Sequence, residues 1–490
     1  MRQLTWLAAL ALLVLASSAI ARAQAIPAVI AAAKAGDHEA LRTLIADGAN
    51  VDAPQGDGAT ALHWAAHLDD ADAARLLLDA GAPVNAANDL GATPLWLAST
   101  SGTAALVQAL LDAGADPNMT LQMGETPLMA AARSGNLPAI ELLLEHGAEV
   151  NTTERERGQT ALMWAAAQGH ADATRLLVNH GADLHARTVV WNQLENTAGN
   201  TNGAGNIDLA HGGSTPLMFV ARHGDVETAR TLVAVGANVN DTAASGTSAL
   251  VIAAHSGHAP LGIHLLEQGA DPNAADGGYT ALHAAVLRGE FDLVEALIEH
   301  GADPNARLER GTPGRRFSTD YSLFHQFVGA NAFWLAALYG EPAILRVLAA
   351  NGADASMSPR NGASSLQAAI GTGQMRYYKN RRNRAGIPSP DPATEEKLIL
   401  DLARIVVDSG VDINAADDRG NTALHDAVRG GFGSVVEFLA AEGADLHLAN
   451  EEGRTALAMA ESRRARGDSN GSPSPRSEIA ELLQRLGARH

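Results

Sequence analysis

One short pattern recurs along nearly the whole chain of 490 residues. Each copy opens with Gly-x-Thr, or a close variant of it, and closes with a stretch like L-L-x-x-G-A. The two landmark glycines are 23 residues apart in nine of the eleven copies that have both. A copy this short cannot bury an apolar face alone, so the copies must stack and share a core between neighbours. The opening glycines are Gly58, Gly91, Gly124, Gly158, Gly213, Gly246, Gly278, Gly329, Gly362, Gly420 and Gly453. The closing glycines are Gly48, Gly81, Gly114, Gly147, Gly181, Gly236, Gly269, Gly301, Gly352, Gly410, Gly443 and Gly487.

The residues between the landmarks predict two short helices in each copy. Thr60 suits a helix N-cap, because its hydroxyl can accept a hydrogen bond from an otherwise unpaired backbone N–H. Proline stands at the next position, which a helix tolerates well, in three copies: Pro94, Pro127 and Pro216. The first helix is expected to end at a glycine that can adopt a positive φ. These glycines are Gly102, Gly135, Gly169, Gly224, Gly257 and Gly289.

Three copies carry the tetrapeptide T-A-L-H, at residues 60–63, 280–283 and 422–425. It resembles the T-P-L-H core of the ankyrin repeat, whose period is about 33 residues. The closing L-L-x-x-G-A-D-x-N resembles the second helix and hairpin of that family. The resemblance covers residues 27–487 and implies an all-α ankyrin-repeat solenoid: about twelve stacked helix-turn-helix units joined by hairpin loops, with the first unit as an N-terminal cap. In this family the hairpin fingers and first helices line a concave, protein-binding side.

The first 23 residues have the features of an export signal. Arg2 precedes an apolar run over residues 4–15, and residues 21–23 form an A-x-A cleavage pattern. The apolar run is short for a membrane-spanning helix. We therefore expect a signal peptide with cleavage after Ala23, and a periplasmic or secreted mature protein without a transmembrane segment. A buried N-terminal helix is the alternative.

The period is interrupted in four places. Two interruptions fall between copies and are expected to extend the hairpin fingers, and two fall inside a copy, between its helices. The predicted organisation is a signal peptide (1–23), ankyrin repeats (24–187, an N-terminal cap plus four units), a hairpin insert (188–212), ankyrin repeats (213–305), a second hairpin insert (306–328), and ankyrin repeats (329–490) with internal inserts near 373–397 and 463–475.

Composition excludes several classes of function. The chain has 55 acidic and 35 basic residues, for a net charge of −20, and this argues against a general nucleic-acid surface. It has no cysteine, so disulfides, thiolate metal sites and cysteine nucleophiles are excluded. We expect no cofactor and a monomeric protein.

The sequence also has no H-E-x-x-H, G-x-S-x-G, S-x-x-K or Walker P-loop motif. Six of the eighteen histidines occupy repeat-equivalent positions that fit structural roles better than metal ligation. At the T-P-L-H position the resemblance implies hydrogen bonds between adjacent turns, and before the closing glycine a positive charge favours a helix C-terminus. The first group is His63, His283 and His425, and the second is His146, His180 and His300. We expect no metal site and no enzyme activity.

Aromatic side chains share two repeat-equivalent positions. Trp64, Trp164 and Phe219 follow the T-x-L-x core, while Trp96 and Trp334 replace its histidine. They are expected either to pack in the stacking core or to form a partly exposed row on the concave wall, where tryptophan is a typical interface anchor.

The best candidates for contact with a partner are the variable positions that flank the fingers and end the first helices. They are Met123, Glu125, Gln159, Gln168, Arg222, His223, Tyr279, Arg288, Tyr339 and Arg429.

A basic loop lies within the third insert, at residues 376–384. Five cations and two tyrosines in this loop could bind an anionic polymer, an acidic protein patch or phospholipid headgroups. A solvated loop, or one that pairs with the acidic surface of the protein itself, is the alternative. The cations are Arg376, Lys379, Arg381, Arg382 and Arg384.

Three functions remain open at this point. The first is an exported scaffold that binds one or more protein partners of unknown identity through its concave face. The second is an enzyme or small-ligand binder whose site is formed by the two finger inserts. The third is attachment to anionic surfaces through the basic loop.

Overall fold

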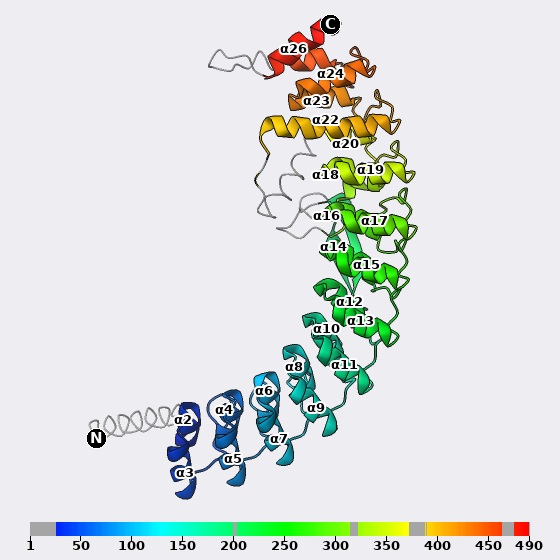
Figure 1. Cartoon of the computed structure of the whole chain (residues 1–490). Coiled ribbons are helices and arrows are strands. Elements are labelled where there is room, and N and C mark those ends of the chain that lie inside the picture. Colours follow the sequence, from blue (N-terminus) through cyan, green and yellow to red (C-terminus); the bar gives the residue numbers. More distant parts are fainter. Residues whose placement is uncertain are drawn as a thin grey trace, which may run out of the picture. The chain divides into compact units, whose positions relative to one another are not determined.

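A computed structural model of the chain describes residues 26–198, 203–313, 322–371, 388, 390–462 and 475–489. These residues form the expected series of helix pairs, in two compact parts (Figure 1). The N-terminal part comprises residues 1–189 and 212–238, and the C-terminal part comprises 190–211 and 239–490. The signal peptide predicted at 1–23 lies outside the described residues.

The N-terminal part has two rows of helices, one from the first helix of each repeat and one from the second (Figure 1). Neighbours within each row pack against one another, and this contact between copies supplies the core that the repeat pattern demands. The first helices are α2 (Ala28–Ala35), α4 (Ala61–His67), α6 (Pro94–Ser101), α8 (Pro127–Ser134), α10 (Ala161–Gln168) and α12 (Pro216–His223). The second helices are α3 (His38–Ala46), α5 (Ala71–Asp79), α7 (Ala104–Asp112), α9 (Leu137–Glu145), α11 (Ala171–Asn179) and α13 (Val226–Ala234).

The C-terminal part repeats this arrangement. Its first helices are α14 (Ala249–Ser256), α16 (Ala281–Arg288), α18 (Ala332–Tyr339), α20 (Ser365–Ile370), α23 (Ala423–Gly430) and α25 (Ala456–Ser462). Its second helices are α15 (Ala259–Glu267), α17 (Phe291–Glu299), α19 (Pro342–Ala350), α22 (Pro392–Asp408), α24 (Gly433–Ala441) and α26 (Pro475–Arg485). Two short 3-10 turns, η1 (Gly203–Gly205) and η2 (His325–Phe327), lie in the finger inserts.

The predicted helix caps are confirmed. Thr93 Oγ1 accepts the Trp96 N–H at 3.2 Å, and Pro94 is the first residue of α6. In α4, the Thr60 N–H donates to His63 Nδ1 at 3.1 Å, while His63 Nε2 bonds the Ala92 carbonyl of the next repeat at 2.9 Å. In T-A-L-H, the threonine and the histidine three residues later therefore cap the first helix together. The same histidine also bonds the next repeat.

At one predicted helix end the expected backbone conformation is wrong, although the helix ends where it was predicted to end. Gly102 ends α6 with a φ of −68°, outside the left-handed region, whereas Gly135 ends α8 with a φ of 71°. Glycine is needed at position 102 for a different reason: a Cβ there would lie 2.5 Å from the Ala98 carbonyl oxygen. After α4 the left-handed residue is Asp69, with a φ of 55°. Its carboxylate accepts the Thr103 N–H at 2.7 Å and so bonds to the next repeat.

The asparagine of the A-D-x-N connector explains the constant spacing of the copies. Asn85 Nδ2 donates to the Gly114 carbonyl at 3.1 Å, and Asn85 Oδ1 accepts the Asp116 N–H at 2.8 Å. The same pair of bonds joins Asn305 to Gly352 and Asp354, at 2.9 and 2.7 Å, across the second finger insert. The insert at 306–328 therefore leaves the stacking of the repeats on either side of it intact.

On the opposite side of each repeat, the finger loops are joined by main-chain hydrogen bonds. The Asp89 N–H donates to the Asp57 carbonyl at 2.9 Å, and the Gln122 N–H donates to the Leu90 carbonyl at 3.0 Å. The Arg155 N–H continues the series to the Met123 carbonyl at 2.8 Å. These bonds hold the tips of successive fingers side by side.

The first insert adds two strands to the helical fold. β1 (Trp191–Asn196) pairs antiparallel with β2 (Asn206–His211), with Trp191 opposite His211. The rings of Trp191 and His211 stack at 5.6 Å. On that face of the ribbon Leu209 is buried, whereas Leu194 on the other face is 68% exposed. Leu209 therefore packs against the protein, whereas Trp191 on the same face is still 39% exposed.

The two inserts predicted inside repeats lie mostly outside the described residues. Of residues 373–397, the structure places 392–397 in α22, which is 17 residues long where most second helices have nine. Glu396, in the added turns, accepts the Ser434 N–H at 2.7 Å and the Ser434 hydroxyl at 2.8 Å. It thereby caps α24, whose own N-cap residue is Phe432 and has no side-chain acceptor.

Candidate protein-binding surface

The first helices of the N-terminal part present a row of aromatic side chains. We call the surface of α2, α4, α6, α8, α10 and α12, together with the finger loops before them, the N-terminal wall. Trp64, Trp164 and Phe219 occupy the same repeat position and are all partly exposed. Trp96, one position earlier in its repeat, is also partly exposed. In the N-terminal part, these aromatic side chains therefore form the partly exposed row that was one of the two predicted arrangements.

Each ring of that repeat position carries a cation over its face. Lys34 Nζ, from the last turn of α2, lies 4.0 Å from the centre of the Trp64 ring in α4. Arg133, from the last turn of α8, lies 4.8 Å from the Trp164 ring in α10. Arg222 covers Phe219 of its own helix at 5.5 Å. A cation over an aromatic face is attracted by the ring quadrupole, so these contacts fix the positions of long, otherwise mobile side chains.

Arg133 also contacts a carboxylate at the base of a finger. Its Nη1 lies 3.2 Å from Glu125 Oε1. Burial raises the pKa of Glu125, the positive charge of Arg133 opposes this shift, and the nearby negative charge of Glu154 adds to it. The Arg133 side chain is 40% exposed. Its guanidinium therefore contacts the Trp164 ring and the Glu125 carboxylate and is still accessible to solvent.

The finger tips supply exposed apolar side chains. Leu90 is 67% exposed and Met123 is 53% exposed, and both stand directly before the opening glycine of their repeats. Main-chain hydrogen bonds join neighbouring fingers, so these two side chains lie on adjacent fingers of one surface. Exposed apolar side chains beside aromatic rings are typical of a surface that another protein covers.

The predicted partner-contact residues fall into three groups. Five of them, Met123, Gln168, Arg222, His223 and Arg429, are exposed. Four others, Glu125, Gln159, Tyr279 and Arg288, are partly exposed. Met123, Glu125, Gln159, Gln168, Arg222 and His223 are brought together on the N-terminal wall, whereas Tyr279, Arg288, Tyr339 and Arg429 belong to the C-terminal part.

The prediction for Tyr339 is wrong, because this side chain is fully buried. All eight residues of α18 are buried, which is unlike the first helices of the N-terminal part. The second finger insert lies over this helix: the Ser322 carbonyl is 3.5 Å from the Tyr339 hydroxyl, and the Phe327 ring is 5.5 Å from the ring of Trp334. Trp334 therefore belongs to the core, in contrast to its aromatic counterparts on the N-terminal wall.

The two finger inserts meet in the C-terminal part. The His325 N–H donates to the Thr197 carbonyl at 2.8 Å, and the Thr197 side chain is buried. Arg310, from the second insert, donates through Nη2 to the carbonyls of Ser245 and Gly277, at 3.3 and 2.8 Å. The inserts thus bind to the fingers and first helices of their own chain.

Tyr279 and Arg288 are also engaged within the C-terminal part. Tyr279 lies against the ring of His255 at 5.7 Å, and burial raises its pKa to about 12 against the opposing charge of Arg310. Arg288 Nε donates to the His255 carbonyl at 2.6 Å. Burial, assisted by the charge of Arg288, lowers the pKa of His255 to about 4. Tyr279 and Arg288 thus pack around His255, and the positive charge of Arg288 disfavours protonation of its ring.

The predicted structural histidines have the expected partners. The Nδ1 atoms of His146, His180 and His300 bond carbonyls in the last turns of their helices, at 2.8, 2.9 and 2.7 Å. No group of three or more metal-ligating side chains occurs in the part of the chain that the structure describes. Nor does any helix among those residues have the length and apolar character needed to span a membrane. The basic loop, with Arg376, Lys379, Arg381, Arg382 and Arg384, lies outside the described residues.

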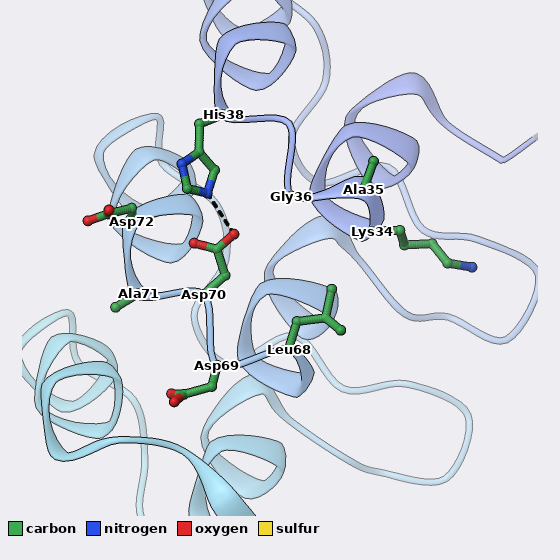
Figure 2. A pocket seen from close by; sticks show the side chains of 9 residues that line it. All are labelled: Lys34, Ala35, Gly36, His38, Leu68, Asp69, Asp70, Ala71 and Asp72. Atoms are coloured by element: carbon green, nitrogen blue, oxygen red, sulfur yellow. Dashed lines mark hydrogen bonds and ion pairs between the residues drawn. The ribbon is translucent and has the colours of Figure 1, made fainter.

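A hollow of about 630 Å³ between the first two repeats is lined by Lys34, His38 and three aspartates, Asp69, Asp70 and Asp72 (Figure 2). His38 Nε2 bonds Asp70 Oδ2 at 2.7 Å, while the Lys34 side chain points away from that pair (Figure 2). The Asp70 oxygens also cap α5. Within this hollow, His38 and Asp70 thus bond each other and join adjacent repeats.

Sequence reasoning missed three residues of the N-terminal wall and its fingers: Lys34, Arg133 and Leu90. Lys34 and Arg133 end first helices at positions equivalent to Arg222, which was predicted, so alignment of the repeats would have found them. Leu90 precedes its glycine as Met123 does. Alignment of the repeats is sufficient to identify these positions as candidates. Only the structure shows that their side chains are exposed.

Stacked helix pairs with joined finger loops define a helical-repeat scaffold. The sequence model of the ankyrin repeat, built on three copies, matches residues 28–121, 95–188, 193–276, 217–307 and 393–484, which together are more than half of the chain. The chain belongs to the ankyrin-repeat family. Proteins of this family are generally protein–protein interaction modules.

Two known proteins illustrate the similarity. The ankyrin repeat protein L271 of Acanthamoeba polyphaga mimivirus is 39% identical over 61 residues, which are 12% of this chain and 8% of that protein. The crystal structure of the human ASB11 ankyrin repeat domain is 30% identical, with a TM-score of 0.41, and the match covers 50% of this chain and 98% of that domain.

Proposed function

We propose that this protein is a scaffold that binds a protein partner on the N-terminal wall, the concave side expected of the family. The observation that carries the proposal is the exposed row of cation-covered aromatic rings beside the apolar tips Leu90 and Met123. In the C-terminal part, the corresponding face at α18 is covered by the second insert of the chain itself. A partner surface of about 800 Å² would extend over several repeats of the wall.

Site-specific photo-crosslinking tests this proposal. A photoreactive residue in place of Met123 is expected to form a discrete protein adduct in the cells that make the protein. The matched control is Val235, which is 47% exposed against 53% for Met123 and follows a second helix, away from the fingers. Adducts at position 235 equal to those at position 123, or no adduct at 123, would contradict the proposal.

We also propose that the protein is exported. The support is Arg2 before the apolar run at 4–15, the A-x-A pattern at 21–23, and a chain free of cysteine, which has no thiols to mispair in an oxidising compartment. The mature protein is expected to begin at Gln24 and to occur in the periplasm or the medium. Mass spectrometry of its N-terminus checks this, with the double variant Ala21→Arg, Ala23→Arg as an uncleaved control. An unprocessed wild-type chain in the cytoplasm would refute export.

A further inference from the structure

Charge is separated between the two helix rows of the N-terminal part. Its six first helices carry three cations and, over their whole described length, no carboxylate. Its six second helices carry eight carboxylates and four arginines. The cations are Lys34, Arg133 and Arg222. On a chain with a net charge of −20, the row of first helices in the N-terminal part is thus a local exception to the acidic surface.

The three cations are held in place for contact with an anion. Each lies over an aromatic ring, so little side-chain entropy remains to be lost when a ligand binds. Lys34 and Arg222 are exposed, and the Arg133 side chain is 40% exposed. Glu125 neutralises part of the charge of Arg133, but a guanidinium has five N–H donors and can serve a second carboxylate.

The finger loops add contacts of a different kind. In the loops at 49–60, 82–93, 115–126 and 148–160 carboxylates outnumber arginines eight to two, so the positive charge of the wall is confined to its first helices. The carboxylate of Glu154 is occupied by backbone N–H groups of its own finger, at 2.6 to 3.0 Å. The exposed apolar tips Leu90 and Met123 belong to the third and fourth repeats, so they follow the Lys34–Trp64 pair and reach the repeat that carries Arg133.

We propose that the N-terminal wall binds an extended acidic segment of a protein partner, with aspartates or glutamates at both ends and aliphatic side chains between them. The acidic ends contact Lys34 on one side and Arg133 and Arg222 on the other, and the aliphatic centre covers Leu90 and Met123. This inference rests on the proposed scaffold function and names the chemistry of its partner.

The spacing of the cations sets the length of the segment. Lys34, Arg133 and Arg222 stand in the first, fourth and sixth repeats. Neighbouring helices pack about 9 Å apart, so the cations extend over about 45 Å. An extended chain advances about 3.3 Å per residue, and therefore spans this distance with about 14 residues.

The test uses the full chain and two labelled peptides of that length, EDEDELVLVEDEDE and KRKRKLVLVKRKRK. Fluorescence anisotropy is expected to show binding of the acidic peptide, weakening as salt rises, and no comparable binding of the basic peptide. The triple variant Lys34→Met, Arg133→Met, Arg222→Met is expected to bind the acidic peptide about tenfold more weakly, with unchanged circular dichroism.

The control variant removes the same charge from the second helices: Arg75→Met, Arg175→Met, Arg230→Met. These arginines are exposed, and the control is expected to change the peptide Kd less than about twofold, because only long-range charge is altered. Equal weakening by both triple variants, stronger binding of the basic peptide, or no binding of the acidic peptide would overturn the inference. An adduct at Met123 in any of these cases would leave the scaffold function standing and assign it to another class of partner.

Discussion

Replacement of Asn331 by alanine is expected to lower the unfolding free energy of the C-terminal part by about 3 kcal/mol. Asn331 takes the place of threonine at the N-cap of α18 and is fully buried. Its Oδ1 accepts the Trp334 N–H at 2.9 Å, and its Nδ2 donates to the Asp354 carbonyl at 2.9 Å. Loss of the cap costs about 1 kcal/mol. The fully buried Asn331 side chain also loses its hydrogen bond to the Asp354 carbonyl and its packing, which costs about 2 kcal/mol more.

Asn331→Thr separates these two contributions. Threonine keeps the cap, as Thr93 does at the equivalent position of α6, but does not supply the amide donor for Asp354. We therefore expect a loss of about 2 kcal/mol in this variant. Urea unfolding combined with amide exchange in α18 measures both variants. Losses of the same size in Asn331→Ala and Asn331→Thr would show that the cap contributes nothing at this position.

The repeat pattern was sufficient to predict the helices and their stacking, because each landmark residue has a local role. Thr60 and His63 act within four residues of sequence, and Asn85 acts one repeat away at a spacing that the period fixes. Interactions of this kind recur in several copies, so one correct interpretation applies to each of those copies.

Features that occur once were harder to predict. Tyr339 has the same repeat position as Gln168 and Arg288, and only the insert folded over α18 makes it a core residue. Similarly, no periodicity predicts that Thr197 and His325, from inserts three repeats apart in the pattern, share a hydrogen bond. Insert conformation depends on long-range packing, and the repeat carries no information about it.

Acidification is expected to destabilise α16 through His283, and this is the second large effect. His283 is fully buried, and burial lowers its pKa from 6.5 to about 4, although the neighbouring carbonyls of Ala330 and Ala306 partly oppose the shift. Between these two values the unfolded chain binds a proton that the folded chain does not. The unfolding free energy therefore falls as pH drops below 6.5, by about 1.4 kcal/mol per pH unit, and by about 3 kcal/mol in total near pH 4.

Other groups titrate in the same range, so the effect of His283 has to be isolated. Burial also lowers the pKa values of His63 and His425, which act in the same direction. Burial raises the pKa of Asp426 to about 6, against the opposing charge of Arg429. The folded chain therefore takes up a proton on Asp426 between pH 6 and 3.8, and this stabilises it as the pH falls.

His283→Met removes the titrating group without a large change of shape. Methionine fills the same repeat position, fully buried, at Met129, Met163 and Met218. At pH 7.5 the variant is expected to be about 1 kcal/mol less stable than the wild type, because the Thr280 N–H loses its bond to His283 Nδ1. Near pH 4 the variant is expected to be more stable than the wild type by about 2 kcal/mol. The reason is that it lacks the imidazole that binds a proton in the unfolded chain but not in the folded chain.

The two stability curves should therefore cross between these pH values. Amide hydrogen exchange in α16, corrected for the intrinsic pH dependence of exchange, measures the local unfolding free energy. Exchange in α8, whose repeat carries Met129 at this position, is the internal reference and should change little between wild type and variant. Parallel curves for α16 would mean that His283 is protonated equally easily in the folded and unfolded chains, and burial would then not govern its titration.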